Sequence, residues 1–110
     1  MTFYIGNFVN EVDNSKRGVE VSDELYNFIW KVCSLSHKNV EILRRIDPYS
    51  DVEIPQKHLQ QLIEICNCII DSSLLQDYDE PDDGKQSLRD LVDIAQKAIS
   101  TNTGLVSIGD

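Results

Sequence analysis

The sequence predicts an α+β fold in which three or four helices pack on a small, mostly antiparallel sheet, formed by the N-terminal hairpin and the C-terminal strand. Residues that favour strands gather at the two ends of the chain, whereas the segments between Ser22 and Ile99 repeat apolar residues at helical spacing. We find no strand signal between Val40 and Ile99, which argues against alternating strand and helix units.

The sheet is expected from three short segments. Thr2 to Val9 is rich in aromatic and β-branched residues, residues 13–18 are turn formers, and Val19 to Val21 returns as the second strand of a hairpin. Leu105 to Ile108 is also short and β-prone. Because neither end of the chain can bury its apolar side chains alone, we expect both ends in one sheet.

A first helix is expected to begin after Ser22, whose side-chain oxygen can cap it, and Asp23 and Glu24 suit the positive end of its dipole. Its apolar residues recur at the spacing of one buried helical face: Leu25, Phe28, Ile29 and Val32. A further helical stretch carries Val40, Leu43 and Ile46. It ends at Asp47 because the proline that follows disfavours helix in the residue before it.

The third helix has the clearest pattern, with Pro55 in its first turn and one buried face of roughly five turns. The residues of that face are Leu59, Leu62, Ile63, Cys66, Ile69, Ile70 and Leu74. Pro81 and Gly84 are interpreted as breakers, so a fourth helix is expected to begin between Asp83 and Ser87 and to end near Asn102 or Gly104. Its predicted buried residues are Leu88, Leu91, Val92, Ala95, Ala98 and Ile99.

Length and composition indicate one globular domain over residues 1–110, because 110 residues with 41% hydrophobic and 26% charged content are ordinary for a folded domain. The N-terminus lacks the features of a signal peptide, and no apolar run approaches the ~20 residues that span a bilayer. Cys33, Cys66 and Cys68 form no disulfide framework and are expected to be reduced, with Cys66 buried. We therefore expect a cytoplasmic location and no membrane partner.

Charge is the most informative feature for function. Nineteen acidic residues stand against ten basic ones, which gives a net charge of -9. The acids are densest from Gln76 to Gly84, a stretch expected to be loop-like, with Tyr78 among them. A field of this sign repels nucleic acid and anionic membranes and attracts basic partners, and tyrosine is favoured in interface hot spots.

A second aromatic-plus-acid loop precedes the third helix and contains Tyr49, Asp51 and Glu53. The candidate partner-binding residues of the two loops are therefore Asp77, Tyr78, Asp79, Glu80, Asp82, Asp83, Tyr49, Asp51 and Glu53. A straight helix between the loops would hold them far apart, which weighs against one shared face. The competing interpretation is a solvated acidic loop that keeps the protein soluble.

No metal or cofactor motif is found. Cys66 and Cys68 are closer in sequence than the sulfurs of redox and zinc motifs, and the isolated glycines make no phosphate loop. A calcium loop counted from Asp77 fails because Pro81 and Asp82 fill its fifth and sixth positions. We expect no cofactor and no metal.

No catalytic motif is found either, because neither His37 nor His58 has a Ser or Cys partner at a recognisable spacing. The chain is therefore expected not to be an enzyme. One catalytic alternative stays open: a small enzyme that uses a histidine–carboxylate pair, with His58 beside Glu64 or Asp51.

In size, acidity, fold class and lack of a catalytic constellation, the whole chain resembles the small acidic immunity proteins that bacteria pair with secreted or contact-delivered toxins, as in contact-dependent growth inhibition. The resemblance implies tight binding to one cognate toxin domain, often a basic nuclease acting on tRNA or other nucleic acid. We also expect a monomer or weak homo-oligomer. The alternatives are a phage-type inhibitor or nucleic-acid mimic directed at a host nuclease, and a subunit of a larger assembly.

Overall fold

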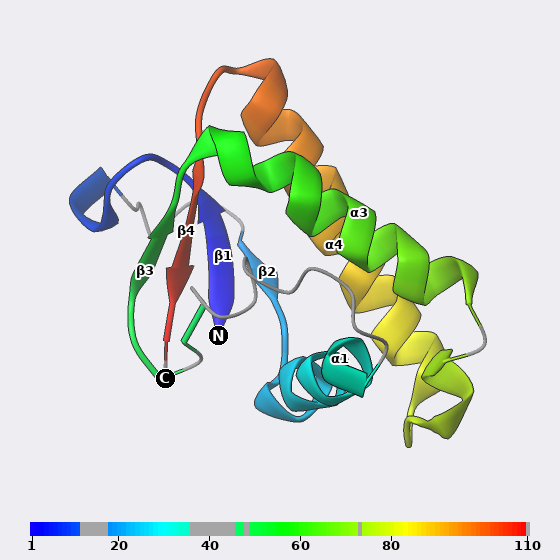
Figure 1. The fold of residues 1–110 in the computed structure, drawn as a ribbon. Coiled ribbons are helices and arrows are strands. Elements are labelled where there is room, and N and C mark those ends of the chain that lie inside the picture. The colour runs from blue at the N-terminus through cyan, green and yellow to red at the C-terminus, as the bar shows by residue number, and fades with distance from the viewer. Residues whose placement is uncertain (12–17, 36–45, 48, 73, 110) are drawn as a thin grey trace.

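The sheet joins the two ends of the chain. The computed structural model describes residues 1–11, 18–35, 46–47, 49–72 and 74–109, and its fold is α+β, as predicted (Figure 1). Four antiparallel strands lie in the order β2-β1-β4-β3, and they are β1 (Thr2–Ile5), β2 (Val19–Glu20), β3 (Val52–Ile54) and β4 (Leu105–Ile108). The predicted hairpin of β1 and β2 and the predicted pairing of the N-terminal segment with Leu105–Ile108 are both confirmed.

The described helices are α1 (Asp23–Leu35), α3 (Leu59–Asp71) and α4 (Pro81–Ser100), with three short 3-10 turns, η1 (Val9–Glu11), η2 (Gln56–His58) and η3 (Leu74–Asp77). The predicted cap of α1 is present, because the Leu25 backbone N–H donates to Ser22 Oγ at 3.2 Å. At the end of α4, Asn102 has a φ of 59°, and the Thr103 N–H donates to the Ala98 carbonyl at 2.8 Å. This is a Schellman ending, in which a left-handed residue stops the helix.

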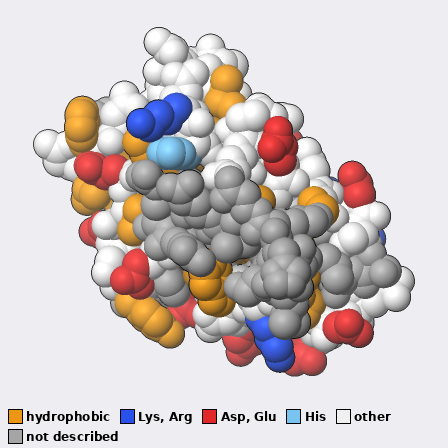
Figure 2. Space-filling view, in the orientation of Figure 1, with side chains coloured by type: hydrophobic (Ala, Val, Ile, Leu, Met, Phe, Trp, Pro, Cys, Tyr) orange, Lys and Arg blue, Asp and Glu red, His pale blue; other side chains and the backbone are white. Residues whose placement is uncertain are grey.

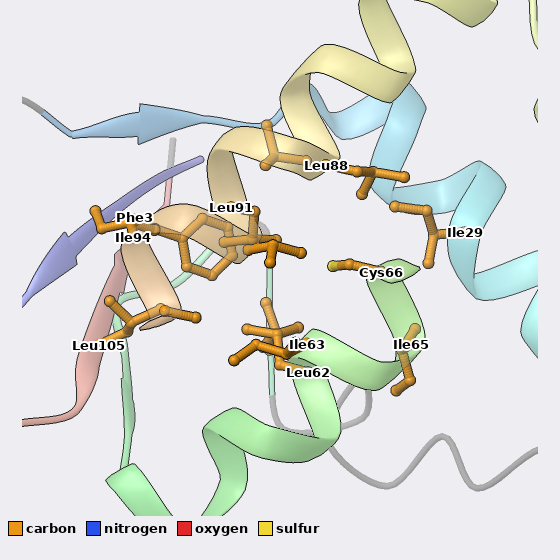
Figure 3. Packing of buried hydrophobic residues seen from close by; sticks show 14 of the residues in the cluster. Phe3, Ile29, Leu62, Ile63, Ile65, Cys66, Leu88, Leu91, Ile94 and Leu105 are labelled. Atoms are coloured by element: carbon orange, nitrogen blue, oxygen red, sulfur yellow. The ribbon is translucent and has the colours of Figure 1, made fainter. Parts of the chain in front are cut away.

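The core lies between the helices and one face of the sheet. Phe3 and Leu105 on the strands, Leu62 and Ile63 on α3, and Leu91 on α4 point toward one another (Figure 3). The predicted buried faces of α3 and α4 are confirmed at most of their positions, although Ile70 and Ile99 are half-buried and Ile65 is buried as well. Cys66 is a buried thiol that is 3% exposed, as predicted.

One strand was missed by the sequence reasoning. The expectation of no strand between Val40 and Ile99 is wrong, because β3 pairs with β4 through Val52 opposite Ser107 and Ile54 opposite Leu105. A strand of three residues next to a proline carries too little alternation to be read locally, and it exists through pairing with β4. The expected helical stretch through Val40 and Leu43 lies outside the described residues.

The N-terminal strand is shorter than predicted. It ends at Ile5 rather than Val9. One further hydrogen bond, just before β4, joins the Gly6 N–H to the Gly104 carbonyl, the chain then bends at residues 7–8, and Val9 begins the turn η1. The third helix is also shorter: α3 ends at Asp71, so Leu74 lies in η3 rather than on the helix.

The acidic stretch is a loop only in its middle. Gln76 and Asp77 belong to η3, residues 78–80 form bends, and α4 begins at Pro81, so the interpretation of Pro81 and Gly84 as breakers is wrong. Pro81 is the first residue of α4, where its missing N–H would have no partner within the helix. Gly84 lies one turn inside the helix and is buried. A methyl group at Gly84 would come within 3.3 Å of the Tyr78 ring and 3.4 Å of the Leu75 side chain, so this glycine allows a close approach of η3 to α4.

Candidate functional site

The acidic segment follows η3 and continues into the first turn of α4. Its five carboxylates are all exposed: Asp77, Asp79, Glu80, Asp82 and Asp83. Asp82 and Asp83 lie in the first helical turn, where the positive end of the dipole stabilises them, so part of this charge has a structural explanation. Figure 2 shows acidic side chains around the left, right and lower margins of the displayed face.

Tyr78, the predicted anchor for a partner, is half-buried against the rest of the protein. Its ring centroid lies 5.2 Å from that of Phe28 on α1, with the two planes tilted by 52°. The ring also lies against Gly84 on α4. Tyr78 therefore ties the acidic segment to two helices, and only part of its surface is left for a partner.

The second predicted loop has structural contacts of its own. Tyr49 is 68% exposed and sits in a turn where its N–H donates to Asp47 Oδ1 at 2.9 Å. Asp51 Oδ1 accepts the Gly109 N–H at 3.1 Å, and Glu53 Oε2 accepts the Val9 N–H at 2.9 Å. These two carboxylates therefore fasten neighbouring segments to the strand β3.

The two predicted loops do not form one face. The loop of Tyr49 to Glu53 leads through β3 to the start of α3, and the acidic segment follows the end of α3. The 13 residues of α3 separate these ends by about 20 Å, and Figure 1 shows β3 and the start of α4 on opposite sides of the molecule. The structure thus separates Tyr49, Asp51 and Glu53 from Asp77 to Asp83.

Two hollows between α4 and the β2 edge do bring acidic residues together. The first, of about 260 Å³, lies between the start of α4 and the segment that enters α1, and its lining includes Glu20, Tyr78, Glu80 and Asp83. The second, of about 510 Å³, lies further along α4. Its described lining is Gly18, Val19, Glu20, Asp90, Asp93, Ile94 and Lys97. Because Glu20 lines both, we treat them as one feature, the α4 groove.

The α4 groove is strongly negative. Five of its described lining residues are acidic, and Lys97 is the single basic one; the acids are Glu20, Glu80, Asp83, Asp90 and Asp93. A hydrogen bond with the Asp83 side chain, together with the negative charge of Asp83, raises the pKa of Glu80, and Glu24 and Asp79 add to the effect. Negative charges are therefore crowded where α4 begins. A positive charge placed among them would relieve their repulsion.

Sequence reasoning found Glu80 and Asp83 but missed Glu20, Asp90 and Asp93. A usable signal exists on α4, because residues 83, 87, 90, 94 and 97 follow at steps of three and four and so share one helical face. No local signal identifies Glu20, which joins the groove through the pairing of β2 with β1.

No hydrogen bond or ion pair that the structure describes joins His58 to Glu64 or Asp51. His58 ends η2, and its Nε2 atom is buried without a hydrogen-bond partner among the described residues. Glu64 is exposed on α3, and Asp51 is bonded to Gly109. Within the described part of the chain, no group of three or more His, Cys, Asp or Glu side chains is placed to hold a metal ion.

Comparison with known proteins finds no match for this chain among family models, curated proteins or solved structures. None of the described helices has the length and apolar character needed to cross a membrane.

Proposed function

We propose that the chain is an immunity protein of the cytoplasm, which binds and neutralises a cognate toxin domain, a basic nuclease such as a tRNase, by charge-complementary contact. The observation that carries the proposal is the α4 groove, whose described lining holds five acidic residues and a single lysine. A basic surface that holds substrate phosphates suits such a groove, and its occupation would keep nucleic acid out.

The crowding at Glu80 and Asp83 supports binding over a solubility role. The helix dipole explains Asp83, but Glu80 precedes the helix and its side chain makes no capping hydrogen bond. Its position beside Asp83 therefore adds a repulsion that a solubility role does not require. The raised pKa of Glu80 beside Asp83 agrees with the proposal, because groups with perturbed pKa values are common at functional sites. A cationic partner side chain would relieve this repulsion on binding.

The proposal is tested by protection. The proposal expects a neighbouring gene for a large secreted protein with a polymorphic C-terminal domain. That domain is expressed in a bacterial host, with and without this chain. The expected result is growth arrest with cleaved tRNA or other nucleic acid in its absence, and normal growth with intact nucleic acid in its presence. Growth arrest that persists although both proteins are made contradicts the proposal.

A further inference from the structure

We infer that the α4 groove receives an extended, lysine- or arginine-rich segment of the partner protein, which adds as a fifth strand to the open edge of β2. The inference rests on the proposed function and specifies how the partner is held. Three features of the groove carry it: the direction of the β2 backbone groups, the length of the groove, and the charge of its walls.

The strand register leaves Glu20 with an N–H and a carbonyl that β1 does not use. The Val21 N–H donates to the Met1 carbonyl at 2.9 Å, and the Met1 nitrogen donates back to the Val21 carbonyl at 3.2 Å, so Met1 and Val21 form a hydrogen-bonded pair. Such pairs alternate along an antiparallel ladder, so the next pair, Thr2 with Glu20, is not hydrogen-bonded. The N–H and carbonyl of Glu20 therefore point away from β1.

The open edge faces the groove. Among the described residues, β2 pairs with β1 alone, and no described group bonds the outer side of Glu20. Exposed strand edges are templates for another strand, and a bound peptide gains affinity from such main-chain hydrogen bonds. Glu20 lies at the meeting point of the two hollows, so a strand added here would run along α4 in both directions.

The two hollows together border enough of α4 for a short strand. From Asp83 to Lys97 the helix rises by about 21 Å, and an extended chain covers that distance with about six residues. Side chains of an added strand alternate between two faces, so about three of the six would face α4. On the α4 side the lining includes Asp83, Asp90 and Asp93, and on the β2 side it includes Glu20. Charge complementarity thus selects a segment with basic residues at alternate positions.

Proline at position 20 tests the strand directly. Glu20→Pro removes an N–H that bonds nothing in the sheet, and proline is tolerated on such an edge. Glu20→Ala is the matched control, because it removes the same carboxylate and keeps the N–H. Thermal unfolding first checks that both variants fold. Binding is then measured to the toxin domain of the protection experiment and to a probe, a six-residue blocked peptide that alternates lysine and valine.

The expected result is that Glu20→Pro binds both ligands about tenfold more weakly than Glu20→Ala, the equivalent of the one backbone hydrogen bond that proline cannot donate. A version of the peptide methylated on alternate backbone nitrogens should lose binding to the native chain by a similar factor. Backbone amide shifts from the unmethylated peptide should centre on Glu20 and the α4 wall.

Two results would overturn the strand addition. One is equal binding of the toxin domain by Glu20→Pro and Glu20→Ala, and the other is equal binding of the methylated and unmethylated peptides by the native chain. Failure of the proposed function is a separate result, because the native chain would then not bind the toxin domain at all. The Glu20→Ala variant measures the effect of removing the carboxylate. The methylated peptide measures the effect of removing backbone hydrogen bonds, and it does so even if the proline variant fails to fold.

Discussion

Replacing Tyr78 by alanine should destabilise the folded protein as well as weaken partner binding. The ring packs on Phe28 at 5.2 Å between centroids and covers Gly84, so it holds the acidic segment against α1 and α4. Truncation to alanine removes the ring pair and the partial burial together. The acidic segment would keep its charge and lose its main side-chain contact with α1.

The expected loss is the sum of two contributions. An aromatic pair of this geometry contributes about 1 kcal/mol, and burying roughly half of an aromatic side chain contributes about another 1 kcal/mol. The free energy of unfolding should therefore fall by about 2 kcal/mol. For a domain of this size, that corresponds to a fall in Tm of roughly 10 °C.

Urea unfolding at pH 7, followed by circular dichroism, measures this loss. Tyr78→Phe is the matched control, because it keeps the ring and should stay within about 0.5 kcal/mol of the native protein. An unchanged unfolding midpoint for Tyr78→Ala would refute the packing role. The ring would then contribute to partner binding and not to stability. Tyr78→Ala should also dissociate faster from the partner. Its dissociation rate is compared with that of Tyr78→Phe, which keeps the ring.

Three further predictions concern stability and reactivity. Because the pKa of Glu80 is raised in the folded protein, its ionisation opposes folding as the pH rises above the ordinary glutamate range. Urea titrations at several pH values should therefore show the free energy of unfolding of Glu80→Gln rising relative to that of the native protein toward neutral pH. A difference between the two that does not change with pH would contradict the repulsion. Leu88→Ala should lower the free energy of unfolding by about 2–5 kcal/mol, since this side chain is 0% exposed; a loss below 1 kcal/mol would mean that α4 is loosely packed. A thiol reagent should label the half-buried Cys68 before the buried Cys66 in the native state, followed by mass spectrometry, and the reverse order would contradict the orientation of α3.

The sequence was enough to predict those elements that depend on residues close together in the chain. Ser22 caps α1, the apolar face of α3 is buried, and Asn102 ends α4, because each depends on residues within one turn or one helical face. The two termini were placed in one sheet by a simple argument from burial. The charge of the acidic segment was also readable, since it needs no fold.

What the sequence reasoning missed depends on contacts between distant segments. Pro81 is a good first residue of a helix as well as a breaker, and only the close approach of Tyr78 and Leu75 explains why Gly84 sits inside α4. The groove itself needs Glu20, which lies some sixty residues before the other acids in sequence and reaches them through the pairing of β2 with β1.

The central claim is that the α4 groove, rather than the overall charge, attracts a basic partner. The most direct test measures association rates with the toxin domain at several salt concentrations for two double variants. Asp90→Asn with Asp93→Asn changes the groove, whereas Glu64→Gln with Asp71→Asn removes the same charge from exposed positions on α3 that line neither hollow.

At low salt the groove variant should associate several-fold more slowly than the α3 variant. The difference should shrink as the Debye length falls from about 30 Å at 0.01 M to about 8 Å at physiological ionic strength. Equal association rates for the two variants at every salt concentration would contradict the account and assign the attraction to net charge alone.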